Sequence, residues 1–231
     1  MINVLCYGDS NTYGQRSEDV ARGRWPAGIR WTSRLAGLLG GGFHVIEEGL
    51  GGRTTDLDYP DSMNRPGRNG RTYLLPALLS HNPLDVVVLM LGTNDLKIQF
   101  GRTAAEVTAA IARLLDDVTA HGRTEGGHPP KVVLVAPARI DVTAPDFAEV
   151  NGAFYDRTSA EKAARLAGLL AELAAARGAT FVDAAAVVEP GADGIHFSLA
   201  SHERFAGVLA GRLLRSDHLG FSASTSVARE S

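Results

Sequence analysis

The sequence predicts an α/β fold with a parallel five-stranded sheet, and two observations support this prediction. Five short apolar runs alternate with five amphipathic helical patterns, which is the order of repeated βα units. The clearest run is DVVVLML at 85–91, which is continuously apolar and rich in β-branched residues. Such a run is typical of a parallel strand that helices cover on both faces.

The elements can be placed in order along the chain. The strands are expected at MINVLCY, beginning at Ile2, and then at Phe43–Glu48, Asp85–Leu91, Lys131–Pro137 and Ala179–Ala184. Apolar residues at helical spacing predict the helices Trp31–Leu39, Tyr73–Ser80, Thr103–Ala120, Thr158–Arg177 and Ser198–Leu214. The crossovers between the strands are expected to be right-handed.

Two helix starts carry capping residues. Thr103 is expected to cap the third helix, with Glu106 three residues later as its capping-box partner. Thr158 or Ser159 is expected to cap the fourth helix in the same way.

Histidines in this chain match no common zinc spacing, and His202 on the last helix is expected at the surface.

Length and composition indicate one domain with a sizeable core. The chain has 231 residues, of which 45% are hydrophobic and 21% charged, so we expect a single domain at 1–215 and a polar tail at 216–231. The net charge of -3 argues against a nucleic-acid partner, and no apolar run is long enough to span a membrane. The first strand leaves no room for a signal peptide, which favours a cytoplasmic protein. The single cysteine, Cys6, is expected as core filler.

Polar or glycine-rich segments follow four of the predicted strands. They are GDSN after the first, GLGGRTTD after the second, GTND after the third, and a loop leading to DGIHF after the fifth. In open α/β sheets, ligands bind beyond the carboxyl ends of the strands, near the point where the strand order reverses. A serine, a glycine turn, an asparagine and an Asp-x-x-His pair are therefore expected on one rim.

This set of residue types suits acyl transfer at a carbonyl group. The Ser10 hydroxyl is a weak nucleophile until a base takes its proton, and His196 can be that base. Asp193 is close enough in sequence to bond the other ring nitrogen and orient the imidazole. The oxyanion needs donors fixed in advance, which the Ser10 N–H, the Gly51–Gly52 turn and the Asn94 amide can supply.

The same segments resemble the four blocks of the SGNH hydrolases, also called the GDSL-like lipase and esterase family. The match comprises GDSN at 8–11, the Gly52 that precedes Arg53, GTND at 92–95 and DGIH at 193–196, in the order of the family. Two longer strings, EEGLGGRTT and LGTNDLK, resemble the bacterial arylesterase and acyltransferase branch. Members of that branch act on small acyl groups such as acetyl, and some transfer them to alcohols or peroxide in water.

The resemblance assigns a role to each block. It implies that Ser10 is the nucleophile, His196 the base and Asp193 its orienting partner. It implies an oxyanion hole of Ser10, Gly52 and Asn94, in a three-layer α/β/α sandwich of the flavodoxin-like type with no cofactor and no metal. We therefore expect a serine esterase for short-chain esters that works through an acyl-enzyme, with acyl transfer to alcohols as a further activity.

Five further residues are expected to contact the substrate: Asp9, Asn11, Trp25, Arg53 and Ile195. Asn11 departs from the family pattern, because many members have leucine there. Arg53 either braces the glycine turn or lines the pocket, and Trp25 either walls the pocket or packs in the interior.

Three irregular stretches, 15–30, 56–71 and 138–157, are expected to wall the pocket. They contain apolar side chains for which the core offers no obvious place, namely Trp25, Ile29, Tyr59, Ile140, Phe147, Phe154 and Tyr155. Arylesterase and acyltransferase relatives form oligomers in which such loops narrow the entrance. We therefore expect a homo-oligomer with a small-molecule ester as its substrate and no membrane partner.

Other functions are compatible with the same fold class. A flavodoxin that binds FMN would also place Ser, Thr, Asn and Gly after the first strand, but it leaves Asn94, Asp193 and His196 without roles. A catalytically inactive binding module is a second alternative, against which the intact blocks argue. A phosphoreceiver domain is excluded because no lysine follows Ala184, and GLGGRT does not fit a dinucleotide-binding fingerprint.

Overall fold

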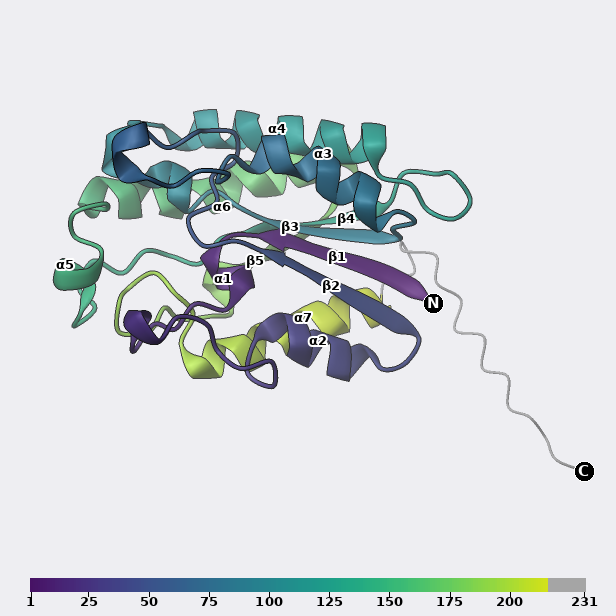
Figure 1. Ribbon diagram of the computed structural model, residues 1–231, viewed down its shortest axis with the longest axis horizontal. Coiled ribbons are helices and arrows are strands. Elements are labelled where there is room, and N and C mark those ends of the chain that lie inside the picture. The colour runs from purple at the N-terminus through teal and green to yellow at the C-terminus, as the bar shows by residue number, and fades with distance from the viewer. Residues whose placement is uncertain (216–231) are drawn as a thin grey trace, which may run out of the picture.

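The computed structural model describes residues 1–215, so the expected polar tail at 216–231 lies outside the described residues. The sheet is parallel and has the order β2-β1-β3-β4-β5 (Figure 1). Its strands are β1 (Ile2–Gly8), β2 (Phe43–Gly49), β3 (Val86–Met90), β4 (Lys131–Ala136) and β5 (Thr180–Asp183). The predicted five-stranded parallel sheet is confirmed, and each strand end lies within one residue of its expected position.

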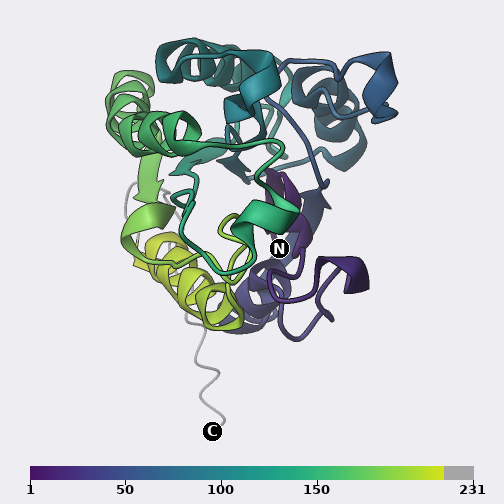
Figure 2. The same cartoon turned by 90° about the vertical axis from the view of Figure 1, so that its left-hand side faces the viewer.

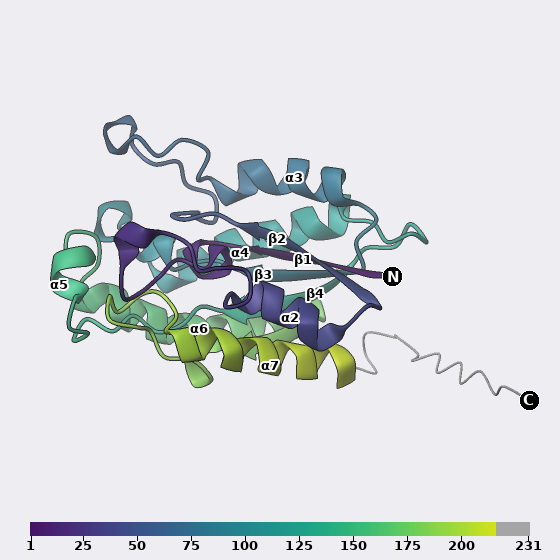
Figure 3. The same cartoon turned by 60° about the horizontal axis from the view of Figure 1, so that its bottom comes forward.

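Helices cover both faces of the sheet and complete the predicted three layers. On one face lie α3 (Gly70–His81), α4 (Ala104–His121) and α6 (Arg157–Arg177), and on the other lie α2 (Trp31–Leu39) and α7 (Leu199–Arg215) (Figures 1 and 3). Figure 2 looks onto the carboxyl ends of the strands, where the short helices α1 (Ser10–Tyr13) and α5 (Phe147–Val150) lie. The strand order reverses at β1 and β3, so the loops after these strands flank the crevice in which such folds bind ligands.

Strand β1 divides its side chains between two cores. Val4 and Cys6 pack toward α2 and α7, whereas Leu5 and Tyr7 pack toward α3, α4 and α6. All four side chains are completely buried, as the period of two along a covered parallel strand requires. Burial raises the pKa of the Cys6 thiol well above its usual value, which fits the expected role of core filler.

Two helices begin earlier than their apolar patterns indicated. α3 starts at Gly70 because the Asn69 side chain caps it by accepting the N–H of Thr72 at 3.2 Å. α6 is capped by Asp156, which accepts the N–H of Ser159 at 2.9 Å, so the expectation of a cap at Thr158 or Ser159 is wrong. The capping box of Thr103 and Glu106 at α4 is confirmed.

His202 is completely buried, which corrects the expectation of a surface position. It shares the inner face of α7 with Phe205, Leu209 and Leu213, at the helical spacing of a core residue. Its Nδ1 accepts the backbone N–H of Trp31 at 3.3 Å and so ties α7 to the first turn of α2. Burial lowers the pKa of the imidazole to about 4, so the ring is neutral in the folded protein near neutral pH.

Most of the apolar loop residues that lacked an obvious place are buried within this chain. Tyr59, Ile140, Phe147 and Tyr155 are each at most 8% exposed, so the expectation that the core does not use them is wrong. The loops fold back over the carboxyl ends of the strands and extend the core there. Phe154 is half-buried beside the cavity described below.

Glu47 on β2 holds the first irregular stretch against the sheet. Arg24 and Arg30 both pair with its carboxylate, at 2.8 and 2.7 Å, and Ser33 donates to it at 2.9 Å. Burial alone would raise the pKa of Glu47, but the hydrogen bonds from Arg30 and its neighbours outweigh it and lower the pKa.

In the part of the chain that the structure describes, no helix has the length and apolar character needed to cross a membrane.

Candidate active site

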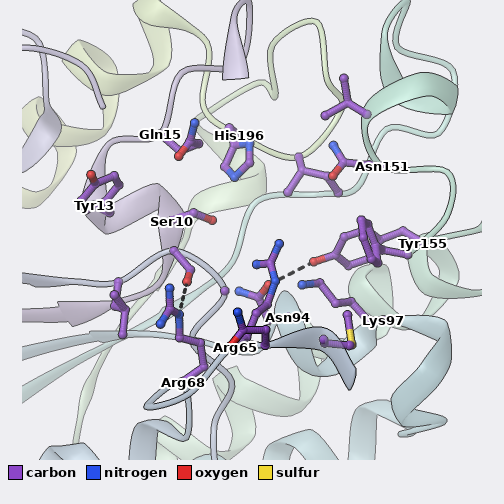
Figure 4. Close-up of a pocket in the computed structure, with 18 residues that line it drawn as sticks. Ser10, Tyr13, Gln15, Arg65, Arg68, Asn94, Lys97, Asn151, Tyr155 and His196 are labelled. Carbon is purple, nitrogen blue, oxygen red and sulfur yellow. Dashed lines mark hydrogen bonds between the residues drawn. The ribbon is translucent and has the colours of Figure 1, made fainter. Parts of the chain in front are cut away.

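Ser10 is the first residue of α1, directly after strand β1. Asp9 caps the helix by accepting the N–H of Asn11 at 3.0 Å, and Gly14 ends it one turn later in the left-handed conformation. The helix packs so closely against β2 that a Cβ on Gly49 would lie 2.1 Å from the Tyr13 nitrogen. Glycine is therefore required there, and the close packing fixes the Ser10 side chain over the cavity (Figure 4).

The segment from Asp193 to His196 is a tight turn around one carboxylate. One oxygen of Asp193 accepts the N–H groups of Ile195 and His196, at 3.0 and 2.9 Å, and the other accepts from His196 Nδ1 at 2.5 Å. Gly194 makes the turn possible, with φ of +74° and no room for a Cβ beside the Asp141 carbonyl. Because a carboxylate only accepts, Nδ1 carries the hydrogen, and in the neutral imidazole Nε2 is the nitrogen with the free lone pair.

Asn11 joins the serine helix to the histidine loop. Its amide donates to the carbonyl of Ile195 at 3.3 Å and its oxygen accepts the N–H of Phe197 at 2.8 Å. These two bonds hold the residues on either side of His196, so Asn11 positions the imidazole relative to its own neighbour, Ser10. The residue that departs from the family pattern thus has a structural task, and it does not line the cavity.

Asn94 begins a 3₁₀ turn (Asn94–Leu96) shortly after strand β3. Hydrogen bonds to both its amide oxygen and its amide nitrogen orient the side chain. The Tyr155 hydroxyl donates to its oxygen at 3.3 Å, and its nitrogen donates to the Arg53 carbonyl at 3.1 Å. Its other approach, to the Asp9 carboxylate, is long at 3.4 Å. One amide N–H of Asn94 is therefore only weakly engaged, and since Asn94 lines the cavity this N–H is the one available to a bound oxygen.

The glycine turn after β2 is also fixed from both sides. Gly52 has φ of +81°, which favours glycine, and its carbonyl accepts from the Tyr59 hydroxyl at 2.8 Å. Arg68 Nε donates to the Gly51 carbonyl at 3.0 Å. In a trans peptide the carbonyl and the following N–H point in opposite directions, so this bond sets the direction of the Gly52 N–H.

Asp95 and Arg53 support the rim from behind. Asp95 accepts the N–H of Thr55 at 2.9 Å and pairs with Arg102 at 3.0 Å, which joins the loops after β2 and β3. Burial raises the pKa of Asp95 to about 6, against the hydrogen bonds from Thr55 and the charge of Arg102. Arg53 is buried, donates to the Gly8 and Glu48 carbonyls and lies 4.2 Å from the centre of the Tyr7 ring.

The rim encloses a cavity of about 720 Å³ (Figure 4). Of the residues predicted to form the site, five line it: Ser10, Gly52, Asn94, Ile195 and His196. Asp193 lies behind His196, and Asp9, Asn11 and Arg53 lie in the supporting structure. Trp25 packs against the Arg16 guanidinium at 4.2 Å rather than on the cavity wall.

A comparison with protein-family profiles shows the family to which the chain belongs. The profile of the GDSL-like lipase/acylhydrolase family matches residues 6–204, a span that holds every one of the four blocks. The chain belongs to this family. The resemblance predicted from the blocks is thereby confirmed, and membership of the family places the chain among the carboxylester hydrolases.

Solved structures of acylhydrolases agree with this family in fold and in sequence. The native aryl esterase of M. smegmatis is 35% identical, with a TM-score of 0.81 over 93% of this chain and 99% of that chain. Est24, a carbohydrate acetylesterase from Sinorhizobium meliloti, is 38% identical, with a TM-score of 0.82 over the same shares. A G-D-S-L family protein from Veillonella parvula is 16% identical, with a TM-score of 0.64 over 93% and 100%, and shows the shared fold alone. A search of curated proteins finds no match.

Sequence reasoning missed several residues of this acylhydrolase site. Lys97, Arg65, Arg68 and Asn151 line the cavity and were not singled out. The stretches 56–71 and 138–157 were expected to wall it, and Tyr155, an apolar residue named in the second stretch, lines it as well. Asn151, the residue that follows α5, donates to the Asp193 carbonyl at 2.8 Å and so braces the histidine loop. Lys97 is the last residue of the LGTNDLK string, and the sequence pattern alone assigns it no role. Among residues 1–215, no group of three or more His, Cys, Asp or Glu side chains is arranged to hold a metal ion.

Proposed function

We propose that this acylhydrolase is a serine esterase that cleaves short-chain, acetyl-like esters through an acyl-enzyme on Ser10. The observation that carries the proposal is that Ser10 and His196 line one cavity, while Asp193 binds the far nitrogen of the imidazole at 2.5 Å. The name of one related structure, a carbohydrate acetylesterase, favours a small acyl group.

The reaction consists of two acyl transfers that use the same groups. Ser10 Oγ bonds to the ester carbonyl carbon while its proton passes to His196 Nε2. The bond from that carbon to the alcohol oxygen then breaks, and the alcohol leaves with the proton from His196. A water molecule next attacks the acyl-Ser10 carbonyl, again giving a proton to His196. The carboxylic acid departs, and the proton returns to Ser10 Oγ.

Three donors are proposed to stabilise the oxyanion of both steps. They are the N–H of Ser10, the N–H of Gly52 and the amide of Asn94. The bonds from Arg68 to Gly51 and from Tyr155 to Asn94 support this role, because they orient the two non-serine donors before any substrate arrives. Asp193 would stabilise the imidazolium that forms on His196 in each step.

The proposal extends to transfer of the acyl group to an alcohol in place of water. Apolar groups such as Phe154, Val150 and Leu50 share the cavity wall with the polar donors. Such a wall lowers the access of water relative to a less polar acceptor. Added alcohol should therefore yield a new ester at the expense of free acid.

The decisive experiment replaces the nucleophile and tests a series of aryl esters of graded acyl length. Ser10→Ala is expected to remove nearly all activity while the circular dichroism spectrum stays unchanged, and a serine-directed phosphonate should add once, at Ser10. Ser80→Ala, a change at an exposed serine of α3, is the matched control and should keep full activity. Labelling at another serine, or an active Ser10→Ala variant, would show that the mechanism is wrong.

A further inference from the structure

The wall of the cavity beside the glycine turn is strongly basic. Lys97, Arg65 and Arg68 all line the cavity, and among residues 1–215 no Asp or Glu side chain does so. We call these three residues the cationic wall. The whole chain carries a net charge of -3, so the positive charge is a local property of this cavity.

Lys97 is the buried member of the cationic wall and its charge lacks a counter-ion there. It is 5% exposed, and its ammonium donates to the Tyr59 hydroxyl at 2.8 Å. The rings of Tyr59 and Phe154 lie 5.0 and 5.4 Å from it. In the described chain no carboxylate forms an ion pair with Lys97. An ammonium group has three donors, so two are left for a bound oxygen.

The nearest carboxylates are committed to other partners. Asp95 pairs with Arg102 and accepts from Thr55, and Asp9 accepts the N–H of Asn11 at the start of α1. A buried charge without a partner is unfavourable, and proteins usually pair it with an ion of the opposite sign. A ligand that brings a negative charge would complete this arrangement.

Arg65 places a second charge next to the proposed oxyanion site. A Cβ on Gly52 would lie 3.0 Å from Arg65 Nη1, so this guanidinium rests directly against the glycine turn. Among the described residues Tyr59, whose ring centre is 5.8 Å away, is the only aromatic ring that the guanidinium contacts, and no carboxylate there forms an ion pair with it. A guanidinium in this position has free donors for a carboxylate or a phosphate.

We propose that the cationic wall binds a carboxylate or phosphate group that the ester substrate carries in addition to its scissile bond. This inference rests on the proposed esterase function and narrows its substrates to anionic esters. The anion can belong to the acyl half or to the alcohol half of the ester, since both halves meet in a cavity of about 720 Å³. The positive electrostatic potential of the cationic wall would also raise the association rate of such substrates at low salt.

The test compares two pairs of esters that differ only in charge. For the alcohol half, para-acetoxybenzoate is compared with para-acetoxybenzamide, and for the acyl half, phenyl hydrogen adipate is compared with its terminal amide. In at least one pair the acid should have a kcat/KM about 10–100-fold above that of the amide, mainly through KM, because the anchor binds away from the reacting atoms. Equal values in both pairs would overturn the inference.

Variants then assign the preference to the wall. Lys97→Met and the exposed Arg65→Gln should each lower the ratio of acid to amide kcat/KM about 10-fold or more. Arg177→Gln removes the same charge at the amino ends of the strands and should leave the ratio unchanged. A variant that slows acid and amide equally would show that the residue acts on the oxyanion or the fold and not on the anion.

The pH profile gives a readout that a structural role would not change. Burial and the nearby Arg65 lower the pKa of Lys97 to about 8, while Asp9 and Asp95 oppose this shift. Tyr59 and Tyr155, which also face Lys97, have pKa values raised above the usual tyrosine value by burial. KM for the anionic ester should therefore rise above pH 8 as Lys97 loses its proton, and this rise should be absent in Lys97→Met.

Binding without chemistry separates this inference from the proposed function. The Ser10→Ala variant is titrated calorimetrically with para-acetoxybenzoate, phenyl hydrogen adipate and their amides. Tighter binding of one acid than of its amide supports the cationic wall. This holds even if the unmodified enzyme hydrolyses no ester, a result that would contradict only the proposed esterase function. Equal binding of acids and amides overturns the inference whatever the activity.

Discussion

At the scale of single residues, the two-sided support of the Asn94 amide predicts the effect of removing it. Asn94→Ala should lower kcat by about 10²–10³-fold, the loss expected for one preorganised oxyanion donor. KM should change far less, because the donor acts on charge that develops in the transition state. Steady-state kinetics with a neutral aryl ester checks this. If KM alone rises, Asn94 positions the substrate and is not an oxyanion donor.

The two bonds from Asn11 to the histidine loop make a second prediction at this scale. Asn11→Ala leaves the N–H of Phe197 without its partner and should lower kcat on the order of 10–100-fold, because His196 loses its fixed position relative to Ser10. Stability should also fall by about 1–3 kcal/mol. A destabilised Asn11→Ala enzyme with normal kcat would contradict the positioning role.

At the scale of elements, the contact between α7 and α2 makes folding stability sensitive to acid. His202 has a folded pKa of about 4 and an unfolded value near 6.5, so the unfolded chain binds a proton first as the pH falls. The stability due to neutral His202 is complete above pH 6.5 and is lost progressively toward pH 4, on the order of 3 kcal/mol in total. Urea denaturation at several pH values measures this loss. His202→Gln should flatten the profile in that window, and an unchanged slope would contradict the assignment.

The elements also show which features of the fold can be predicted from sequence patterns. The central strand β3 was predictable because a parallel strand under two helix layers must be apolar throughout, as in DVVVLML. The start of α6 was not, because Asp156, Thr158 and Ser159 are all good caps and only the loop before them selects Asp156. The inward position of His202 was readable from its spacing to Phe205 and Leu209, but its polar ring favoured the surface.

In the site, too, residues at the ends of strands could be predicted from the sequence, whereas residues in irregular loops could not. Ser10, Gly52, Asn94 and His196 were predictable because the carboxyl ends of parallel strands meet at one edge of the sheet. The irregular stretches were expected to wall the pocket, but the individual side chains Arg65, Arg68 and Asn151 were not predictable, because the path of such loops depends on packing against the finished core. The burial of Lys97 is likewise a product of the loops that cover it.

At the scale of the whole molecule, we expect this chain to form a homo-oligomer. Large apolar side chains are exposed on its surface, among them Leu75 and Leu79 on α3 and Ile98 beside the cavity rim, at 38%, 60% and 45%. Light scattering should give a mass of at least two chains. In a series of esters of graded acyl length, activity should fall steeply beyond short acyl groups. Ile98→Asp and Leu79→Asp, compared separately, should show which patch holds the subunits together. A monomer that prefers long-chain esters would contradict this expectation.

The burial of Cys6 has a practical consequence for observing the enzyme at work. It is the only cysteine in the sequence, and it lies completely buried between the sheet and α2 with its thiol held protonated. A maleimide reagent should therefore leave the native protein unlabelled. A single cysteine introduced at Met63, on the half-buried rim of the cavity, would then be the sole reactive thiol. A fluorophore attached there could report substrate arrival and product departure in real time, in an otherwise unaltered chain.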